Sequence, residues 1–164
     1  MRYLKCDAGV CITASHNPAK YNGYKAYGSD GCQITSEMAN DVSAEIAATD
    51  IFEGVRCMSF DEGMKQGLIS WIPDKVMDEF LSAVESQKMI DEPCTGLKVV
   101  YTPLNGTGLI PVKRILDRIG VEEVTVVPEQ EQPDGNFTTC PFPNPEIREA
   151  LQKGLELCEK VHPD

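Results

Sequence analysis

The chain has 164 residues, a formal net charge of −11 at pH 7, and 41% hydrophobic residues. This length suits one domain or two small ones, and the apolar content is enough to form a packed core. The acidity argues against binding to a nucleic-acid backbone or an anionic membrane, so any anionic substrate must be held by local donors.

Seven cysteines are spread along the chain, and no two of them form a C-x-x-C pair. An odd count without metal-ligand spacing favours reduced cysteines that act as small apolar residues, some of them at core positions, in a reducing compartment. The chain shows no signal-peptide pattern and no apolar run of membrane-spanning length, so we expect a cytoplasmic protein. The cysteines are Cys6, Cys11, Cys32, Cys57, Cys94, Cys140 and Cys158.

The first third of the chain predicts a strand, a hairpin and a helix. Val10–Ala14 is apolar and is expected to form a short buried strand. Tyr24–Tyr27 and Cys32–Ile34 flank the turn sequence GSDG, which is typical of a hairpin. Ser36 can cap a helix. The apolar face of this helix would carry Met38, Val42 and Ile46.

The region from residue 50 to residue 70 has no clear pattern, and a second helix is expected after it. Pro73 suits the first turn of that helix. Its apolar face would carry Val76, Met77, Phe80, Leu81 and Val84. Met89–Gly96 combines acidic residues with a proline and a glycine, which is typical of a linker.

After this linker the sequence predicts a strand, a glycine-rich loop, a helix and another strand. The segments LKVVYT and EVTVV are the strands, PLNGTG is the loop, and the helix runs from Leu109 to Gly120. This order is typical of a parallel pair of strands with a crossover helix. Asn144 would cap a last helix with Pro145 in its first turn. Its apolar face would carry Ile147, Leu151, Leu155 and Cys158.

The expected fold class is therefore α/β, in two pieces joined near residue 93. Residues 1–92 would form the first piece and residues 93–164 the second. A single strand–helix–strand unit with one more helix leaves a sheet edge uncovered, which folded proteins usually avoid. We expect the chain to be an excerpt of a longer one.

The stretch SHNP follows directly on the first predicted strand. Pro18 disfavours helical geometry at Asn17, so Ser15, His16 and Asn17 are expected in a loop at the strand's end, where α/β sheets bind ligands. A serine hydroxyl needs a nearby base or cation to react, and His16 and Lys25 are candidates. The alternative is a plain turn with a solvated histidine and surface lysines, because Ser, Asn and Pro all favour turns.

The longer string GVCITASHNPAKYNGYKAYGSDGCQIT resembles the active-site segment of the α-D-phosphohexomutases, the phosphoglucomutase and phosphomannomutase family. KVVYTPLNGTG and PDGNFTTCPFPNPE look like segments of that family's second domain, although the family often has F-P-T where this chain has Phe137, Thr138 and Thr139. The positions that match the active-site motif are Thr13, Ala14, Ser15, His16, Asn17, Pro18, Asn22, Gly23, Tyr24, Lys25, Asp30 and Gly31.

The resemblance implies two partial three-layer α/β domains with mixed sheets, the first carrying a phosphoserine loop and the second ending before the metal loop. It implies that Ser15 relays a phosphoryl group between positions 1 and 6 of glucose or mannose phosphate through a sugar bisphosphate. Lys25 would act as general acid or base and bind substrate. His16 would assist proton movement, and Asn17 would hold the loop's shape and bind substrate.

The family also uses Mg²⁺, held by the phosphoserine and by three aspartates of a D-x-D-x-D-R loop, with glucose 1,6-bisphosphate as activator. Ser15 would be the metal ligand in this chain, which has no D-x-D sequence. The other partners would be the phosphosugar and the remaining domains of the parent enzyme. We therefore expect these 164 residues to be inactive or nearly so by themselves.

Other interpretations stay open at this stage. A phosphopentomutase or a glucose-1,6-bisphosphate-forming branch of the same family would fit the same segments, and so would a binding module without catalysis. A serine hydrolase is disfavoured because the chain lacks a G-x-S-x-G elbow.

Overall fold

The computed structural model describes residues 1–164 and divides them into two compact units. The first unit comprises Met1–Thr13 and Tyr24–Pro73, and the second comprises Ala14–Gly23 and Asp74–Asp164. Each unit contains both helices and strands, so the predicted α/β class is confirmed. The predicted boundary between residues 92 and 93 stays a prediction.

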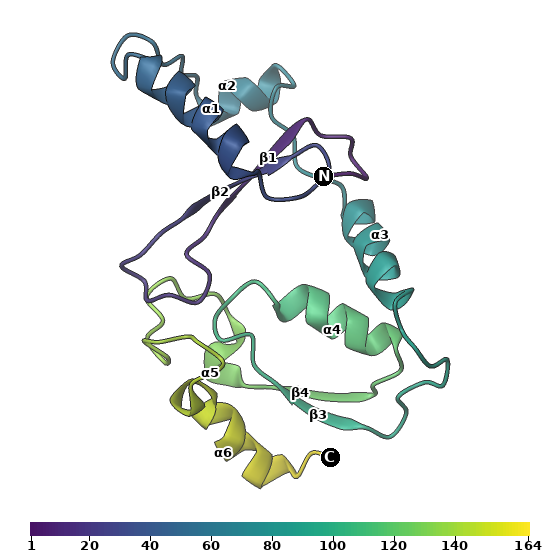
Figure 1. The fold of residues 1–164 in the computed structure, drawn as a ribbon. Helices are drawn as coiled ribbons and strands as arrows, with labels where there is room; N and C mark the ends of the chain where they lie inside the picture. Colours follow the sequence, from purple (N-terminus) through teal and green to yellow (C-terminus); the bar gives the residue numbers. More distant parts are fainter. The chain divides into compact units, whose positions relative to one another are not determined.

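The first unit contains two strands and two helices, and the second contains the rest (Figure 1). The elements of the first unit are β1 (Ala8–Ile12), β2 (Tyr24–Gly28), α1 (Ser36–Ala48) and α2 (Phe60–Lys65). Those of the second are α3 (Asp74–Glu85), β3 (Lys98–Tyr101), α4 (Leu109–Arg118), β4 (Glu123–Val126), α5 (Pro128–Glu131), the 3₁₀ helix η1 (Arg148–Leu151) and α6 (Gln152–Val161).

In the first unit β1 and β2 form an antiparallel pair, and its last residue pair is Ile12 opposite Tyr24. The predicted hairpin after β2 is present, because the Gly28 amide donates to Cys32 O (3.0 Å) and a bridge joins Tyr27 to Gln33. Its turn needs Gly31, whose φ of 82° favours a residue without a side chain.

Two details of the first unit differ from the prediction. The first strand ends at Ile12 instead of Ala14, and it is not buried, since Val10 is 53% and Ile12 60% exposed. The cap of α1 is Thr35 and not Ser36: Thr35 Oγ1 accepts a hydrogen bond from the amide of Met38 (3.4 Å). Thr35 has the extended backbone that a capping residue requires, whereas Ser36 is already helical.

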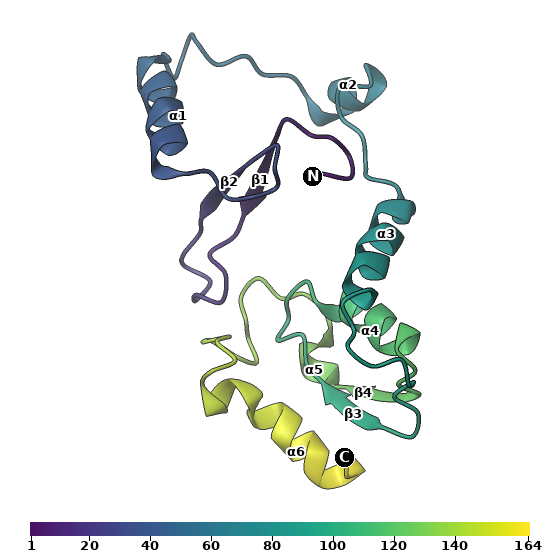
Figure 2. The same cartoon turned by 45° about the vertical axis from the view of Figure 1, so that its right-hand side comes forward.

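The second unit is built around β3 and β4, which run parallel with Lys98 opposite Glu123. The crossover helix α4 lies on one side of this pair and α6 on the other, so the unit has three layers (Figures 1 and 2). The strands and the crossover helix agree with the predicted strand–helix–strand unit. All buried hydrophobic side chains of the chain lie in the second unit; they are Leu81, Val121, Val127, Cys140 and Ala150.

Helix α3 is present, but it begins at Asp74, one residue after the predicted start at Pro73. Polar contacts of Arg118, which we call the clamp, join α3 to α4. The Arg118 guanidinium bonds Asp78 Oδ1 (2.9 Å) and Ser82 Oγ (3.0 Å). At the end of α4, the amide of Cys94 donates to the carbonyl oxygen of Ile119 (2.8 Å). The predicted linker therefore returns along the end of α4.

The last helix begins later than predicted. Instead of capping a helix, Asn144 opens a turn: its carbonyl accepts from the amide of Ile147 (3.0 Å) and its Oδ1 from that of Glu146 (3.0 Å). Asn and Pro favour such a turn as much as a helix start, and here the turn forms. The chain then passes through η1, and α6 starts at Gln152. None of the helices combines the length and the apolar character that crossing a bilayer requires.

Candidate functional site

Residues 13–23 connect β1 to β2 and hold Ser15 in an unusual backbone conformation. Ser15 has φ of 59°, in the left-handed region that costs a non-glycine residue roughly 1–2 kcal/mol. The loop turns sharply around it, because the amide of Asn17 donates to Ala14 O (3.2 Å). Such strain gathers at functional sites, and the serine side chain is exposed.

The structure brings Ser15 and His16 together. Ser15 Oγ and His16 Nδ1 lie 3.4 Å apart, and both residues are exposed. Asn17 follows at the same turn and is also exposed. Lys25 lies in β2 opposite Cys11, where it is half-buried. Because Lys25 belongs to the first unit and the loop to the second, the pairing of Lys25 with Ser15 stays a prediction.

A second candidate region lies at the carboxyl end of β3, in the loop PLNGTG. Its centre is Asn105, which is buried at 6% exposure and has φ of 58°. The Asn105 side chain donates from Nδ2 to the carbonyl oxygens of Gln132 (2.8 Å) and Glu129 (3.4 Å). Its Oδ1 accepts from the hydroxyl of Thr139 (3.0 Å). One buried amide thus fastens residues 128–140 to the end of β3.

A second contact ties the same two segments. Thr102 Oγ1 bonds Gln130 Oε1 at 2.7 Å and accepts from the amide of Leu104 (3.0 Å). Gln130 is almost fully buried, and its backbone carbonyl accepts from the amide of Asn105 (2.9 Å). The sequence indicated a glycine-rich loop here but not this network, because its partners lie about 25 residues apart.

The loop that follows α5 is organised around Asp134. Its carboxylate accepts from the amides of Asn136 (2.9 Å) and Thr138 (2.8 Å). These hydrogen bonds, chiefly those from Thr138, lower the pKa of Asp134. The loop also places Phe137 at φ of 48°. Asp134 is therefore used as an acceptor that shapes the loop.

No three or more His, Cys, Asp or Glu side chains gather where they could hold an ion. Ser15 alone cannot do so, since Mg²⁺ takes several oxygen ligands in octahedral geometry.

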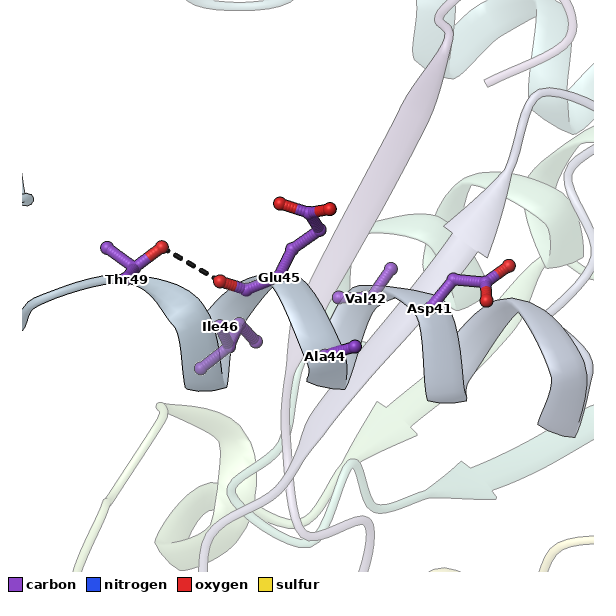
Figure 3. A pocket seen from close by; sticks show the side chains of 6 residues that line it. All are labelled: Asp41, Val42, Ala44, Glu45, Ile46 and Thr49. Atoms are coloured by element: carbon purple, nitrogen blue, oxygen red, sulfur yellow. Dashed lines mark hydrogen bonds between the residues drawn. The ribbon is translucent and has the colours of Figure 1, made fainter.

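A hollow beside α1 is a poor candidate (Figure 3). Its lining comes from α1 and the residue that caps its end, Thr49, whose hydroxyl donates to Glu45 O (2.8 Å). The ionisable groups that it offers are the carboxylates of Asp41 and Glu45, which repel an anionic substrate.

Two family models match the chain. Residues 1–51 match "Phosphoglucomutase/phosphomannomutase, alpha/beta/alpha domain I", and residues 78–164 match domain II of the same family. Among curated proteins, a phosphoglucomutase of Staphylococcus epidermidis is 34% identical over 167 aligned residues. That of Staphylococcus aureus (strain USA300) is 35% identical over 168. Both alignments cover 100% of this chain but only 30% and 29% of the relatives.

Solved structures agree on the fold. The crystal structure of a provisionally assigned phosphomannomutase from Thermus thermophilus superposes with a TM-score of 0.71 at 22% identity. It covers 95% of this chain and 32% of that protein. A phosphoglucomutase/phosphomannomutase family protein from Burkholderia thailandensis gives a TM-score of 0.65 at 22% identity, over 96% of this chain and 30% of that one.

Proposed function

The chain belongs to the phosphoglucomutase/phosphomannomutase family, and from this membership we propose that it supplies the phosphoryl-relay segment of a phosphohexose mutase. Ser15 is the proposed carrier. The observation that carries the proposal is its exposed hydroxyl, presented at φ of 59° in a loop after a strand, inside the segment that matches domain I.

The proposed chemistry needs one phosphoryl transfer in each direction. A hydroxyl oxygen of a sugar monophosphate attacks the phosphorus on Ser15, the bond from phosphorus to Ser15 Oγ breaks, and a sugar bisphosphate forms. The hydroxyl proton passes to a base, for which Lys25 is our candidate. The second transfer returns the other phosphoryl group to Ser15. His16, 3.4 Å from Ser15 Oγ, is the candidate for moving protons at the carrier oxygen.

Charge sets a condition on this proposal. A phosphate on Ser15 adds about −1.5 to −2 charges. The chain already carries −11, so the relay needs cationic groups or a metal nearby. In this proposal the phosphate on Ser15 would be one ligand of a Mg²⁺ ion, and residues 1–164 contain no group of three or more His, Cys, Asp or Glu side chains that could hold the ion by themselves.

The chain spans about 30% of the length of its curated relatives. The choice between glucose and mannose phosphate, and the use of glucose 1,6-bisphosphate as activator, therefore belong to the proposal. So does near-absence of activity in the isolated chain. A non-catalytic module remains the competing proposal.

The test is a chimera in which this chain replaces the aligned 29% of the Staphylococcus aureus phosphoglucomutase. Cooperative unfolding establishes that the chimera folds. It is then incubated with glucose 1,6-bisphosphate and Mg²⁺, mapped for phosphate, and assayed with glucose 1-phosphate. Ser15→Ala tests the carrier, and Ser29→Ala, at another exposed serine, is the matched control.

Phosphate on Ser15, with turnover that Ser15→Ala abolishes and Ser29→Ala keeps, supports the relay. A folded chimera that takes no phosphate on Ser15 supports the binding module and overturns the proposal.

A further inference from the structure

The chain contains the dipeptide Asn-Gly twice, at Asn22-Gly23 and at Asn105-Gly106. We propose that Asn22 is a site of spontaneous deamidation, the conversion of its side-chain amide to a carboxylate, and that Asn105 is protected from it. The two sites share the Asn-Gly dipeptide, although their flanking residues differ, and the structure places the two dipeptides in different surroundings. The proposal concerns a modification and does not require the phosphoryl relay.

Asn22 combines exposure with a suitable approach of the reacting groups. The backbone amide of Gly23 donates to Asn22 Oδ1 at 2.8 Å, so this nitrogen already lies against the side-chain amide that it would attack. Asn22 is exposed, and water and hydroxide reach it. Gly23 has no side chain to hinder the attack, and glycine adopts the backbone angles of a cyclic intermediate without strain.

The reaction balances without any cofactor. The Gly23 amide loses its proton to hydroxide, and the nitrogen attacks Asn22 Cγ. The new bond from Gly23 N to Asn22 Cγ replaces the bond from Cγ to Nδ2. The side-chain nitrogen Nδ2 takes a proton from water and leaves as ammonia. Water then opens the cyclic imide at either of its carbonyls and yields aspartate or isoaspartate. The product carries one more negative charge.

At Asn105 the corresponding atoms form other hydrogen bonds, which oppose this reaction. It is only 6% exposed, and its Nδ2, the leaving group, donates to Gln132 O at 2.8 Å. The attacking nitrogen of Gly106 donates instead to Pro103 O at 2.9 Å. These contacts must open before the imide can form, and local opening has its own free-energy cost.

The position of Asn22 gives the modification a consequence. It lies in the segment that runs from Ser15 to Lys25, and the added charge falls on a chain with a net charge of −11. Deamidation would make this segment less favourable for a phosphate anion. If the segment does bind phosphosugars, deamidation weakens that binding.

The experiment is incubation of the 164-residue chain at mildly alkaline pH, followed by peptide mapping that separates asparagine, aspartate and isoaspartate. The same incubation in denaturant is the control, because both sites then lack structure. Asn22→Gln checks the assignment, and Gly23→Ala tests the steric step.

We expect Asn22 to react at least about tenfold faster than Asn105 in the folded chain, a ratio that ~1.4 kcal/mol of opening free energy already produces. We expect the two rates to converge in denaturant. Equal rates in the folded chain, or an Asn22 that reacts only after unfolding, overturn the proposal. Because the readout is a peptide mass, it is independent of whether Ser15 carries phosphate.

Discussion

Replacing Asn105 by alanine should loosen the contact between the β3 end and residues 128–140. The change removes two short bonds, from Nδ2 to Gln132 O (2.8 Å) and from the Thr139 hydroxyl to Oδ1 (3.0 Å), together with the longer bond from Nδ2 to Glu129 O (3.4 Å). The carbonyl oxygen of Gln132 then loses its donor, and the hydroxyl of Thr139 loses its acceptor. Both contacts are partly buried. Alanine, in addition, must adopt the φ of 58° that asparagine tolerates better.

The magnitude follows from these contributions. Two neutral hydrogen bonds contribute about 1 kcal/mol each, or about 2 kcal/mol together. The left-handed backbone adds about 1 kcal/mol for alanine. We expect Asn105→Ala to lower the free energy of unfolding of the second unit by about 3 kcal/mol. Asn105→Gly is the matched control: it removes the same side chain but tolerates the backbone angle, so it should retain about 1 kcal/mol more than alanine.

The assay is urea unfolding followed by circular dichroism, together with hydrogen exchange of the Asp134–Cys140 amides. The reasoning requires faster exchange in this loop for both variants. If Asn105→Ala unfolds within about 0.5 kcal/mol of the unmodified chain, the buried amide does not hold the loop. If Asn105→Gly is no more stable than Asn105→Ala, the contribution assigned to the left-handed backbone is wrong.

Three further predictions concern the second unit. An added Cβ at Gly108 would lie 2.5 Å from the Tyr101 hydroxyl oxygen but 3.9 Å from Tyr101 Cζ. Gly108→Ala should therefore lower the free energy of unfolding by about 1–3 kcal/mol by itself, and by much less in the Tyr101→Phe background. Equal losses in the two backgrounds of this double-mutant cycle would refute the clash. Arg118→Ala should lower the free energy of unfolding by about 1 kcal/mol through loss of the α3–α4 clamp, a modest value because Asp78 is half-exposed. It should also speed proteolysis of residues 86–97, and an unchanged cleavage rate would contradict this role of Arg118. The pKa of Asp134 is lowered from its ordinary value near 3.8, so its carboxylate stabilises the fold above that pH and the contribution is lost as pH falls through the lower folded pKa. Urea midpoints of the unmodified chain and of Asp134→Asn should thus differ at neutral pH and converge in acid, and a constant gap would contradict this.

The elements that sequence predicted best are those in which several local signals agree. For α4, the apolar spacing, the preceding glycine-rich loop and Gly120 after its end all indicate the same helix. The SHNP loop was placed correctly because Pro18 disfavours helical geometry at Asn17, which is a local effect. Local chemistry was sufficient in both cases.

The last helix and the Asn105 network show where local signals fail. At Asn144 the same residues suit a turn and a helix cap, and only the observed bonds to Glu146 and Ile147 decide between them. The sequence indicated Asn105 only as part of a glycine-rich loop, in a segment that resembles the family's second domain. Its role depends on the carbonyls of Glu129 and Gln132, whose position follows from the parallel pairing of β3 with β4.

The apolar stripe of α1 marks a third kind of limit. The spacing of Met38, Val42 and Ile46 correctly predicted a helix, yet these side chains are 49%, 46% and 66% exposed. Periodicity states which face of a helix gains free energy on burial, and it does not state what covers that face. On α3 the same kind of pattern gives a mixed result, because Leu81 is 1% exposed while Phe80 is 58% and Val84 42% exposed. The burial of each apolar position therefore depends on its packing partners, which no single helical sequence encodes.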